Sequence, residues 1–159
     1  MKRVFLVLVL MAVLPVLVGF KPHKEGKREG VEWKEWNQAY PKAIESKKIL
    51  LIDIYTDWCG WCKRMDKDTY AKENIQDLIE GDFIPVKFNP EEENKTYVVD
   101  GNEVNGRQLL GMLVQGNRVG YPTTVFLIPK ADEFKPVQVS GYQGPSDFKK
   151  TLNKVMGMK

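Results

Sequence analysis

The hydrophobic residues of the 159-residue chain follow two patterns, one typical of strands and one typical of helices. The two patterns alternate along the chain, which predicts an α/β protein. Short, continuous apolar runs rich in β-branched and aromatic residues predict strands. In chain order, these strands are predicted at residues 49–56, 82–88, 123–128 and 137–140. Apolar residues three and four positions apart predict helices. They are predicted at about residues 33–44, 59–67, 72–80, 107–115 and 145–156.

The order of these elements predicts a mixed sheet with helices on both faces. The strand at 49–56 is apolar on both faces, which is typical of a central strand. Two prolines modify the pattern. Pro41 is expected to kink or restart the first helix, and Pro85 suits the start of its strand better than the middle. Trp33 and Trp36 of the first helix are predicted to pack in the core. We find no internal repeat and no second domain.

The long polar connection at 89–105 contains a hairpin pattern. Two short β-prone segments, 96–99 and 102–104, flank Asp100-Gly101, a dipeptide typical of tight hairpin turns. This insertion is either a surface embellishment or a flap that faces substrate, and the residues alone do not separate the two.

The N-terminus has the pattern of a secretory signal. Basic residues precede an apolar stretch that reaches Phe20, and a polar tract follows. We therefore predict a signal peptide at 1–20, a polar tether at 21–30 and one domain at 31–159. The positions before a cleavage site usually hold small residues, and this chain matches that requirement poorly. An uncleaved N-terminal anchor is therefore the alternative. The predicted location is exported and periplasmic, with membrane contact only through that segment if it is retained.

Charge excludes a nucleic-acid partner. Removing residues 1–20 takes Lys2 and Arg3 from the 24 basic residues, which leaves 22 against 21 acidic ones. No basic patch stands out in the remainder, and the basic tract at 21–28 is interpreted as a solvated tether.

The two cysteines carry the candidate chemistry. Cys59 and Cys62 are separated by Gly60-Trp61, directly after a predicted strand and at the start of a predicted helix. A helix N-terminus favours thiolate over thiol, so this placement indicates a redox dithiol. A static disulfide is the alternative, but so small a loop removes little chain entropy. A closed zinc site needs about four ligands, and the chain offers two cysteines and the remote His23. We expect no metal and no cofactor besides the redox-active disulfide.

These residues resemble the thioredoxin superfamily over most of residues 31–156. The resemblance rests on the cysteine motif, on Asp53 in the strand before it, on Lys87 in the next strand, and on Tyr121-Pro122 before the late strand. More narrowly, the Cys-Gly-Trp-Cys motif is similar to that of exported bacterial thioredoxin-like proteins. The resemblance implies a thioredoxin fold with an inserted hairpin-like loop.

The resemblance also implies roles for the catalytic residues. Cys59 would attack a partner disulfide, and Cys62, one turn further and more buried, would resolve the mixed disulfide. Asp53 stands in an apolar strand, where a carboxylate is costly unless it is paired or protonated. Asp53 is therefore an acid/base that takes the proton of Cys62, a member of a buried structural ion pair, or a carboxylate turned to the edge of the sheet. Lys87 is its partner by position.

Five further residues are predicted to contact substrate. Pro122 corresponds to the cis-proline of the superfamily, and the backbone before it, at Tyr121, would pair with a substrate strand. Trp58, Gly60 and Trp61 would form a contact surface for partner proteins. Simple packing is the alternative for both tryptophans, more for Trp58 than for Trp61.

The predicted function is a thiol–disulfide oxidoreductase that acts on protein disulfides or dithiols outside the cytoplasm. A reductant there needs an electron donor, for which a membrane-bound thiol reductase is expected. Because Trp61 stands where typical thioredoxins carry proline, the motif does not give the direction of electron flow, and an oxidase or isomerase is the enzymatic alternative. A binding module that holds a client or a metal, with a regulatory dithiol, is the alternative of another class.

Overall fold

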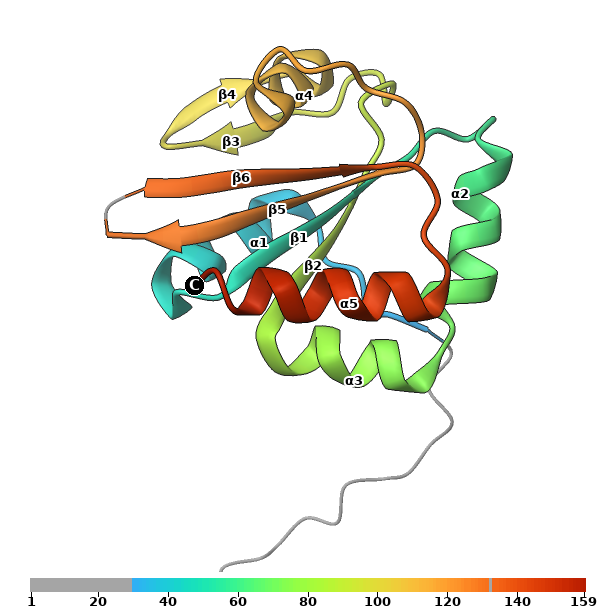
Figure 1. Ribbon diagram of the computed structural model, residues 1–159. Coiled ribbons are helices and arrows are strands. Elements are labelled where there is room, and N and C mark those ends of the chain that lie inside the picture. The colour runs from blue at the N-terminus through green and yellow to red at the C-terminus, as the bar shows by residue number, and fades with distance from the viewer. Residues whose placement is uncertain (1–29, 132) are drawn as a thin grey trace, which may run out of the picture.

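The computed structural model describes residues 30–131 and 133–159, and Figure 1 shows their arrangement. The helices are α1 (Trp36–Ser46), α2 (Gly60–Met65), the π-helix η1 (Asp66–Tyr70), α3 (Glu73–Asp82), α4 (Gly106–Val114) and α5 (Pro145–Met156). The strands are β1 (Ile49–Ile54), β2 (Phe83–Phe88), β3 (Tyr97–Val99), β4 (Asn102–Val104), β5 (Thr123–Lys130) and β6 (Glu133–Ser140). No helix within the described ranges is long and apolar enough to cross a membrane. The predicted signal segment 1–20 and the predicted tether 21–30, except its last residue, lie outside those ranges.

The main sheet has the strand order β2-β1-β5-β6. Strand β1 pairs in parallel with β2 and antiparallel with β5, and β6 continues the sheet antiparallel to β5. Helices α3 and α5 lie on one side of this sheet, and α4 with the β3-β4 hairpin lies on the other (Figure 1). The predicted mixed α/β sheet with helices on both faces is therefore confirmed.

Strand β1 is central because it is apolar on both faces. All six of its residues are buried. Leu50, Ile52 and Ile54 belong to one core cluster, whereas Ile49 and Leu51 belong to the other. Since side chains alternate along a strand, Asp53 continues the face of Ile49 and Leu51, the face that the cluster with α3 and α5 covers.

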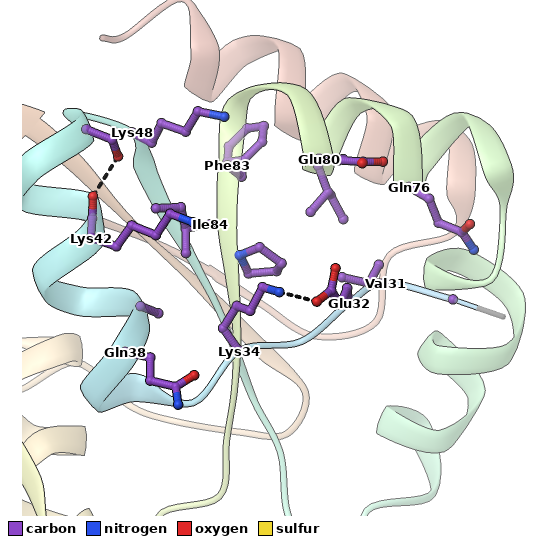
Figure 2. A pocket seen from close by; sticks show the side chains of 15 residues that line it. Val31, Glu32, Lys34, Gln38, Lys42, Lys48, Gln76, Glu80, Phe83 and Ile84 are labelled. Atoms are coloured by element: carbon purple, nitrogen blue, oxygen red, sulfur yellow. Dashed lines mark hydrogen bonds and ion pairs between the residues drawn. The ribbon is translucent and has the colours of Figure 1, made fainter. Parts of the chain in front are cut away.

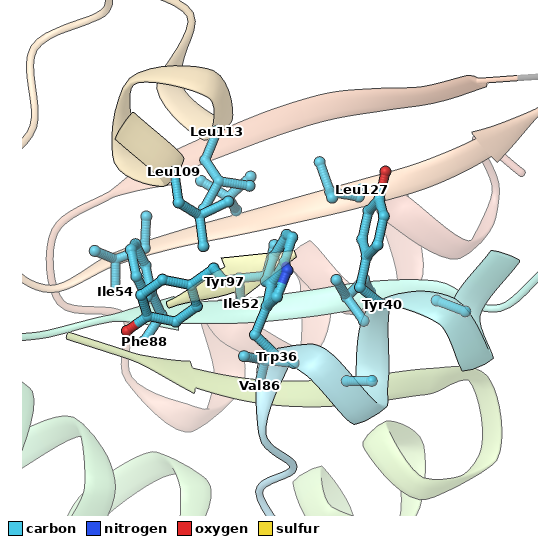
Figure 3. Close-up of a cluster of buried hydrophobic side chains, with 14 of the residues drawn as sticks. Trp36, Tyr40, Ile52, Ile54, Val86, Phe88, Tyr97, Leu109, Leu113 and Leu127 are labelled. Carbon is cyan, nitrogen blue, oxygen red and sulfur yellow. The ribbon is translucent and has the colours of Figure 1, made fainter. Parts of the chain in front are cut away.

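The first core cluster joins α1, the sheet, the hairpin and α4. Figure 3 shows Trp36 and Tyr40 of α1 beside Ile52 of β1, with Leu109 of α4 above them. Trp36 is 2% exposed, so its predicted place in the core is confirmed. The predicted hairpin is also confirmed, since β3 and β4 pair antiparallel around Asp100-Gly101.

Several predicted boundaries were wrong. Helix α1 begins at Trp36, and Trp33 lies before it, half-buried with its ring 4.9 Å from that of Tyr70. Pro41 lies inside α1, so of its two predicted effects the restart of the helix was wrong. The helix predicted at 59–67 ends at Met65 and passes into η1, and β6 begins four residues earlier than predicted.

Pro85 occupies the middle of β2 rather than its start. The position is allowed because β2 is an edge strand of the main sheet. A short parallel bridge between Lys34 and Val86 covers part of that edge, where the Lys34 amide donates to the Pro85 carbonyl at 2.9 Å. The Pro85 carbonyl, the one backbone group of this residue that can form a hydrogen bond, therefore has a partner.

Candidate active site

The two cysteines lie where the chain leaves β1 and enters α2. Cys59 is the N-cap of α2, and its Sγ accepts a hydrogen bond from the Cys62 amide at 3.0 Å. A disulfide joins Cys59 to Cys62, with their Cα atoms 5.3 Å apart. Cys59 and Cys62 are 4% and 3% exposed, so both are buried in this oxidised form, and Cys62 is the more buried of the two by a narrow margin. Both sulfurs remain close to the helix start, where backbone amides favour a thiolate.

Asp53 and Lys87 are brought together by sheet register. They are paired neighbours on β1 and β2, and Lys87 Nζ lies 3.5 Å from Asp53 Oδ2. Asp53 is 1% exposed, and its Oδ1 has no hydrogen-bond partner among residues 30–131 and 133–159. Burial is the largest influence and raises the pKa of Asp53 to about 6, against a smaller lowering by Lys87. A carboxyl of this pKa can accept or release a proton near neutral pH.

A second carboxylate, Asp66, shares the lysine. Lys87 Nζ donates a hydrogen bond to Asp66 Oδ1, and the charge of Asp66 further raises the pKa of Asp53. Lys87 Nζ also lies 5.1 Å from the ring centroid of Trp33 and 5.2 Å from that of Tyr55. Sequence reasoning missed Asp66, although its spacing of one helical turn from Cys62 was the available signal.

The predicted cis-proline site is present. The Tyr121–Pro122 bond is cis, and the two residues lead directly into β5. The Gly141 amide donates to the Pro122 carbonyl at 2.8 Å, which ties the loop after β6 to this site. The Tyr121 ring meets the Trp58 ring edge-on, with centroids 5.6 Å apart. Tyr121 therefore belongs to the same surface as the cysteine motif.

Both tryptophans of the motif are exposed, which contradicts simple packing for either. Trp58 and Trp61 are 68% and 55% exposed, and Gly60 between them is exposed as well. Trp58 Nε1 donates to Glu91 Oε2 at 2.9 Å, and the Trp61 ring lies 5.5 Å from the Tyr142 ring. Sequence reasoning missed Glu91 and Tyr142 because neither is near the motif along the chain.

A metal cluster or a pocket would be another sign of a functional site. Within the described residues, no three His, Cys, Asp or Glu side chains gather as they would around a metal ion. A pocket of about 630 Å³ lies between α1, α3 and the edge of β2 (Figure 2). Lys34, Lys42 and Phe83 are among its lining residues, and none of the predicted site residues is.

A family model matches nearly the whole described chain. Residues 23–158 match the model Thioredox_DsbH, whose description is "Protein of unknown function, DUF255". The chain belongs to this family. The match covers the cysteine motif, the Asp53–Lys87 pair and the cis-proline together, so the whole site lies within the part of the chain that the Thioredox_DsbH model matches.

Curated relatives resemble the chain at low identity. The thiol:disulfide interchange protein DsbD of Photorhabdus laumondii is 26% identical over 159 residues, which cover 95% of this chain and 25% of the relative. Spermatogenesis-associated protein 20 of Homo sapiens is 27% identical over 105 residues, which cover 65% of this chain and 12% of the relative. The chain thus spans about a quarter or less of the length of these relatives.

Solved structures support the fold of this Thioredox_DsbH protein. A thioredoxin from Thermus thermophilus has a TM-score of 0.62 at 21% identity, covering 80% of this chain and 88% of the thioredoxin. A structure titled "DsbH Oxidoreductase" has a TM-score of 0.59 at 14% identity, covering 88% of this chain and 94% of that one. The fold is that of thioredoxin, as the resemblance implied.

Proposed function

We propose that this protein is a thiol–disulfide oxidoreductase that exchanges electrons with protein disulfides or dithiols. The observation that carries the proposal is the Cys59–Cys62 disulfide at the start of α2, preceded along the chain by a strand that holds a buried carboxyl, Asp53, of pKa about 6. A two-residue loop is a poor structural staple. A dithiol at a helix start, with a proton acceptor built into the adjacent strand, is suited to opening and closing.

The proposed reaction moves two electrons from the reduced dithiol to a partner disulfide. The Cys59 thiolate attacks one partner sulfur, a Cys59–partner disulfide forms, and the other partner sulfur leaves as a thiolate that takes a proton. Cys62 then gives its proton to Asp53 and attacks Cys59 Sγ. The Cys59–Cys62 bond forms, and the second partner sulfur leaves as a thiolate. Run backwards, the same steps oxidise a partner dithiol.

Partner and compartment are part of the proposal. The similarity to proteins named thiol:disulfide interchange protein DsbD supports exchange between thiols and disulfides. A reductant in an oxidising compartment needs an electron donor, and a membrane-bound thiol reductase is the donor proposed. The signal-like pattern of residues 1–20 supports an exported, periplasmic location. N-terminal sequencing of protein from a periplasmic extract tests the location, and recovery of intact Met1 from the cytoplasmic fraction would overturn it.

The catalytic proposal is tested with single cysteine variants. Wild-type protein is expected to accelerate the reduction of insulin by dithiothreitol, and Cys59→Ser is expected to abolish that acceleration. Cys62→Ser retains the attacking sulfur and is expected to accumulate a mixed disulfide with its partner, which mass spectrometry identifies. If Cys59→Ser reduces insulin at the wild-type rate, the dithiol is not catalytic and a thioredoxin-fold binding module becomes the better description.

A further inference from the structure

The exposed indole of Trp61 is held by a contact outside the cysteine motif. The Arg64 guanidinium carbon lies 5.3 Å from the centroid of the Trp61 ring and 5.6 Å from that of Tyr142. The two rings are themselves 5.5 Å apart and tilted by 47°. One guanidinium therefore contacts both rings, in the range where cation–π attraction operates.

Arg64 also has a polar partner of its own. Its Nε donates to Asp68 Oδ2 at 3.1 Å, a pair four residues apart that links α2 to the π-helix η1. The side chain of Arg64 is 59% exposed, so the contact with the rings is made at the surface. A guanidinium suits this place because its planar face can stack on a ring while its edge donates hydrogen bonds.

The Tyr142 side of the contact is anchored by its neighbours on both sides. The Gly141 amide donates to the Pro122 carbonyl at 2.8 Å, and the Gln143 carbonyl accepts from Thr69 Oγ1 at 2.7 Å. Gly141 adopts φ 88°, a conformation that favours glycine. The segment that carries Tyr142 is therefore tied both to the cis-proline site and to η1.

We infer that Arg64 is a positioning residue that holds Trp61 against Tyr142 and so fixes the face that receives an extended segment of a partner protein. The inference rests on the proposed function. The occupant is a polypeptide segment with an apolar side chain beside its reacting cysteine, because the face offers two aromatic rings and the loop of Tyr142 is continuous with the cis-proline site. A fixed indole has less conformational freedom to lose when it is covered, so Arg64 favours protein disulfides over small ones.

The test compares two disulfides of different size. We expect Arg64→Gln to raise the KM for insulin about two- to fivefold, the effect of one exposed cation–π contact, with a smaller change in kcat. With hydroxyethyl disulfide, which is too small to cover the rings, kcat/KM should fall less than with insulin. Lys63→Gln is the matched control, because it removes one charge at an adjacent exposed position of α2, and we expect it to match wild type.

A double variant shows whether Arg64 acts through Trp61. In a Trp61→Ala background, Arg64→Gln should have no further effect on the KM for insulin. Equal losses in both backgrounds, equal losses for both disulfides, or the same effect from Lys63→Gln would each overturn the inference. If wild-type protein reduces neither disulfide, the proposed function fails instead, and the two failures are distinguished.

Discussion

At the scale of single residues, the charge group around Lys87 dominates the site. One ammonium group contacts two carboxylates, but it lies 3.5 Å from Asp53 and forms its hydrogen bond with Asp66. Asp53 is buried, whereas the side chain of Asp66 is 41% exposed. Lys87 therefore interacts with one buried carboxylate, whose desolvation is costly in free energy, and with one that remains hydrated. Its charge offsets only part of the cost of burying the Asp53 carboxylate.

Replacing Asp53 should stabilise the folded protein at neutral pH. Burial raises the pKa of this carboxyl from 3.8 to about 6. Between these values the folded state binds more protons than the unfolded state, so folding stability falls as pH rises and the full cost is present above about pH 6. We expect Asp53→Asn to raise the unfolding free energy by about 1–3 kcal/mol at pH 7.5, with the gain lost towards pH 4.

Urea unfolding of the oxidised protein at several pH values measures this effect. Asp57→Asn is the matched control, because Asp57 is exposed and lies four residues further on, and its effect should stay within about 0.5 kcal/mol. A pH-independent gain for Asp53→Asn would show that ionisation of Asp53 is not its cause.

Replacing Asp66 should lower the pKa of Asp53. Asp66→Asn removes a negative charge that raises this pKa, and it leaves Lys87 free to pair with Asp53. NMR titration of the Asp53 carboxyl carbon is expected to show a lower midpoint than in wild type. Asp68→Asn removes an equal charge two residues further along η1 and should leave the midpoint in place. An unchanged or higher midpoint for Asp66→Asn would mean that the Lys87 ammonium group does not pair more closely with Asp53 when Asp66 is replaced.

Sequence patterns located the site residues that are local to one element or recognisable by resemblance. Cys59 and Cys62 follow an apolar strand, and Asp53 is conspicuous as a charge inside it. Asp66, Glu91 and Tyr142 were missed because they reach the site through tertiary contacts that no local period encodes. For the same reason, the sequence leaves packing open as the alternative role of Trp58, which is exposed in the structure.

At the scale of elements, the inserted hairpin is docked on α1. Trp36 Nε1 donates to the Val98 carbonyl at 2.9 Å, and Tyr40 OH donates to Asp100 Oδ1 at 3.0 Å. The Asn37 side chain donates to the Thr96 carbonyl and accepts from the Val98 amide. The hairpin itself is thus a packed extension of the core, and it is the turn before it that brings Glu91 to Trp58.

That turn depends on a close approach at Gly106. A Cβ atom on Gly106 would lie 2.6 Å from the Pro90 carbonyl oxygen, whereas one on Gly111 in the same helix would meet open space. We expect Gly106→Ala to destabilise the protein by about 1–3 kcal/mol, since backbone must move to admit the methyl group. Gly111→Ala should instead stabilise it by up to about 1 kcal/mol, through helix propensity.

Thermal unfolding of the two alanine variants distinguishes these effects, because both add the same methyl group to α4. The Trp58 environment provides a second readout: Gly106→Ala should alter the tryptophan fluorescence if the Pro90–Glu91 turn shifts. Equal stability changes for both variants would mean that the approach to Pro90 does not constrain the turn.

The π-helix explains why one predicted helix boundary was wrong. Ala71 donates to the Asp66 carbonyl at 3.0 Å, a spacing of five residues. A hydrophobic period of 3.6 residues describes α-helices, so it does not register this wider turn. The π-helix begins at Asp66 and contains Asp68, the residues that pair with Lys87 and Arg64. The π-helix η1 therefore supplies both Asp66, the carboxylate that sequence reasoning missed, and Asp68, the partner of Arg64.

At the scale of the whole molecule, the two edges of the main sheet are protected in different ways. The β2 edge carries Pro85 and is partly covered through Lys34. The β6 edge is long, and among the described residues it pairs only with β5; it carries Lys135 and Pro136. Charged residues and proline are common on edges that do not pair with other chains. The mixed sheet with a central strand at 49–56 was predicted from the sequence, but the length of β6 was underestimated because Pro136 interrupts its apolar pattern.

Removing the protection of β6 should cause self-association. Pro136 faces Leu127 in the β5–β6 register. A valine there would add a backbone donor to a strand whose other side pairs with no strand of residues 30–131 and 133–159. We expect the double variant Lys135→Val/Pro136→Val to form dimers and larger species at about 100 µM, a range in which exposed strand edges associate. Sedimentation velocity measures the distribution, with Lys149→Val on exposed α5 as a control for added surface hydrophobicity. If the double variant sediments as wild type does, or if Lys149→Val associates equally, the paired lysine and proline are not what keeps β6 unpaired.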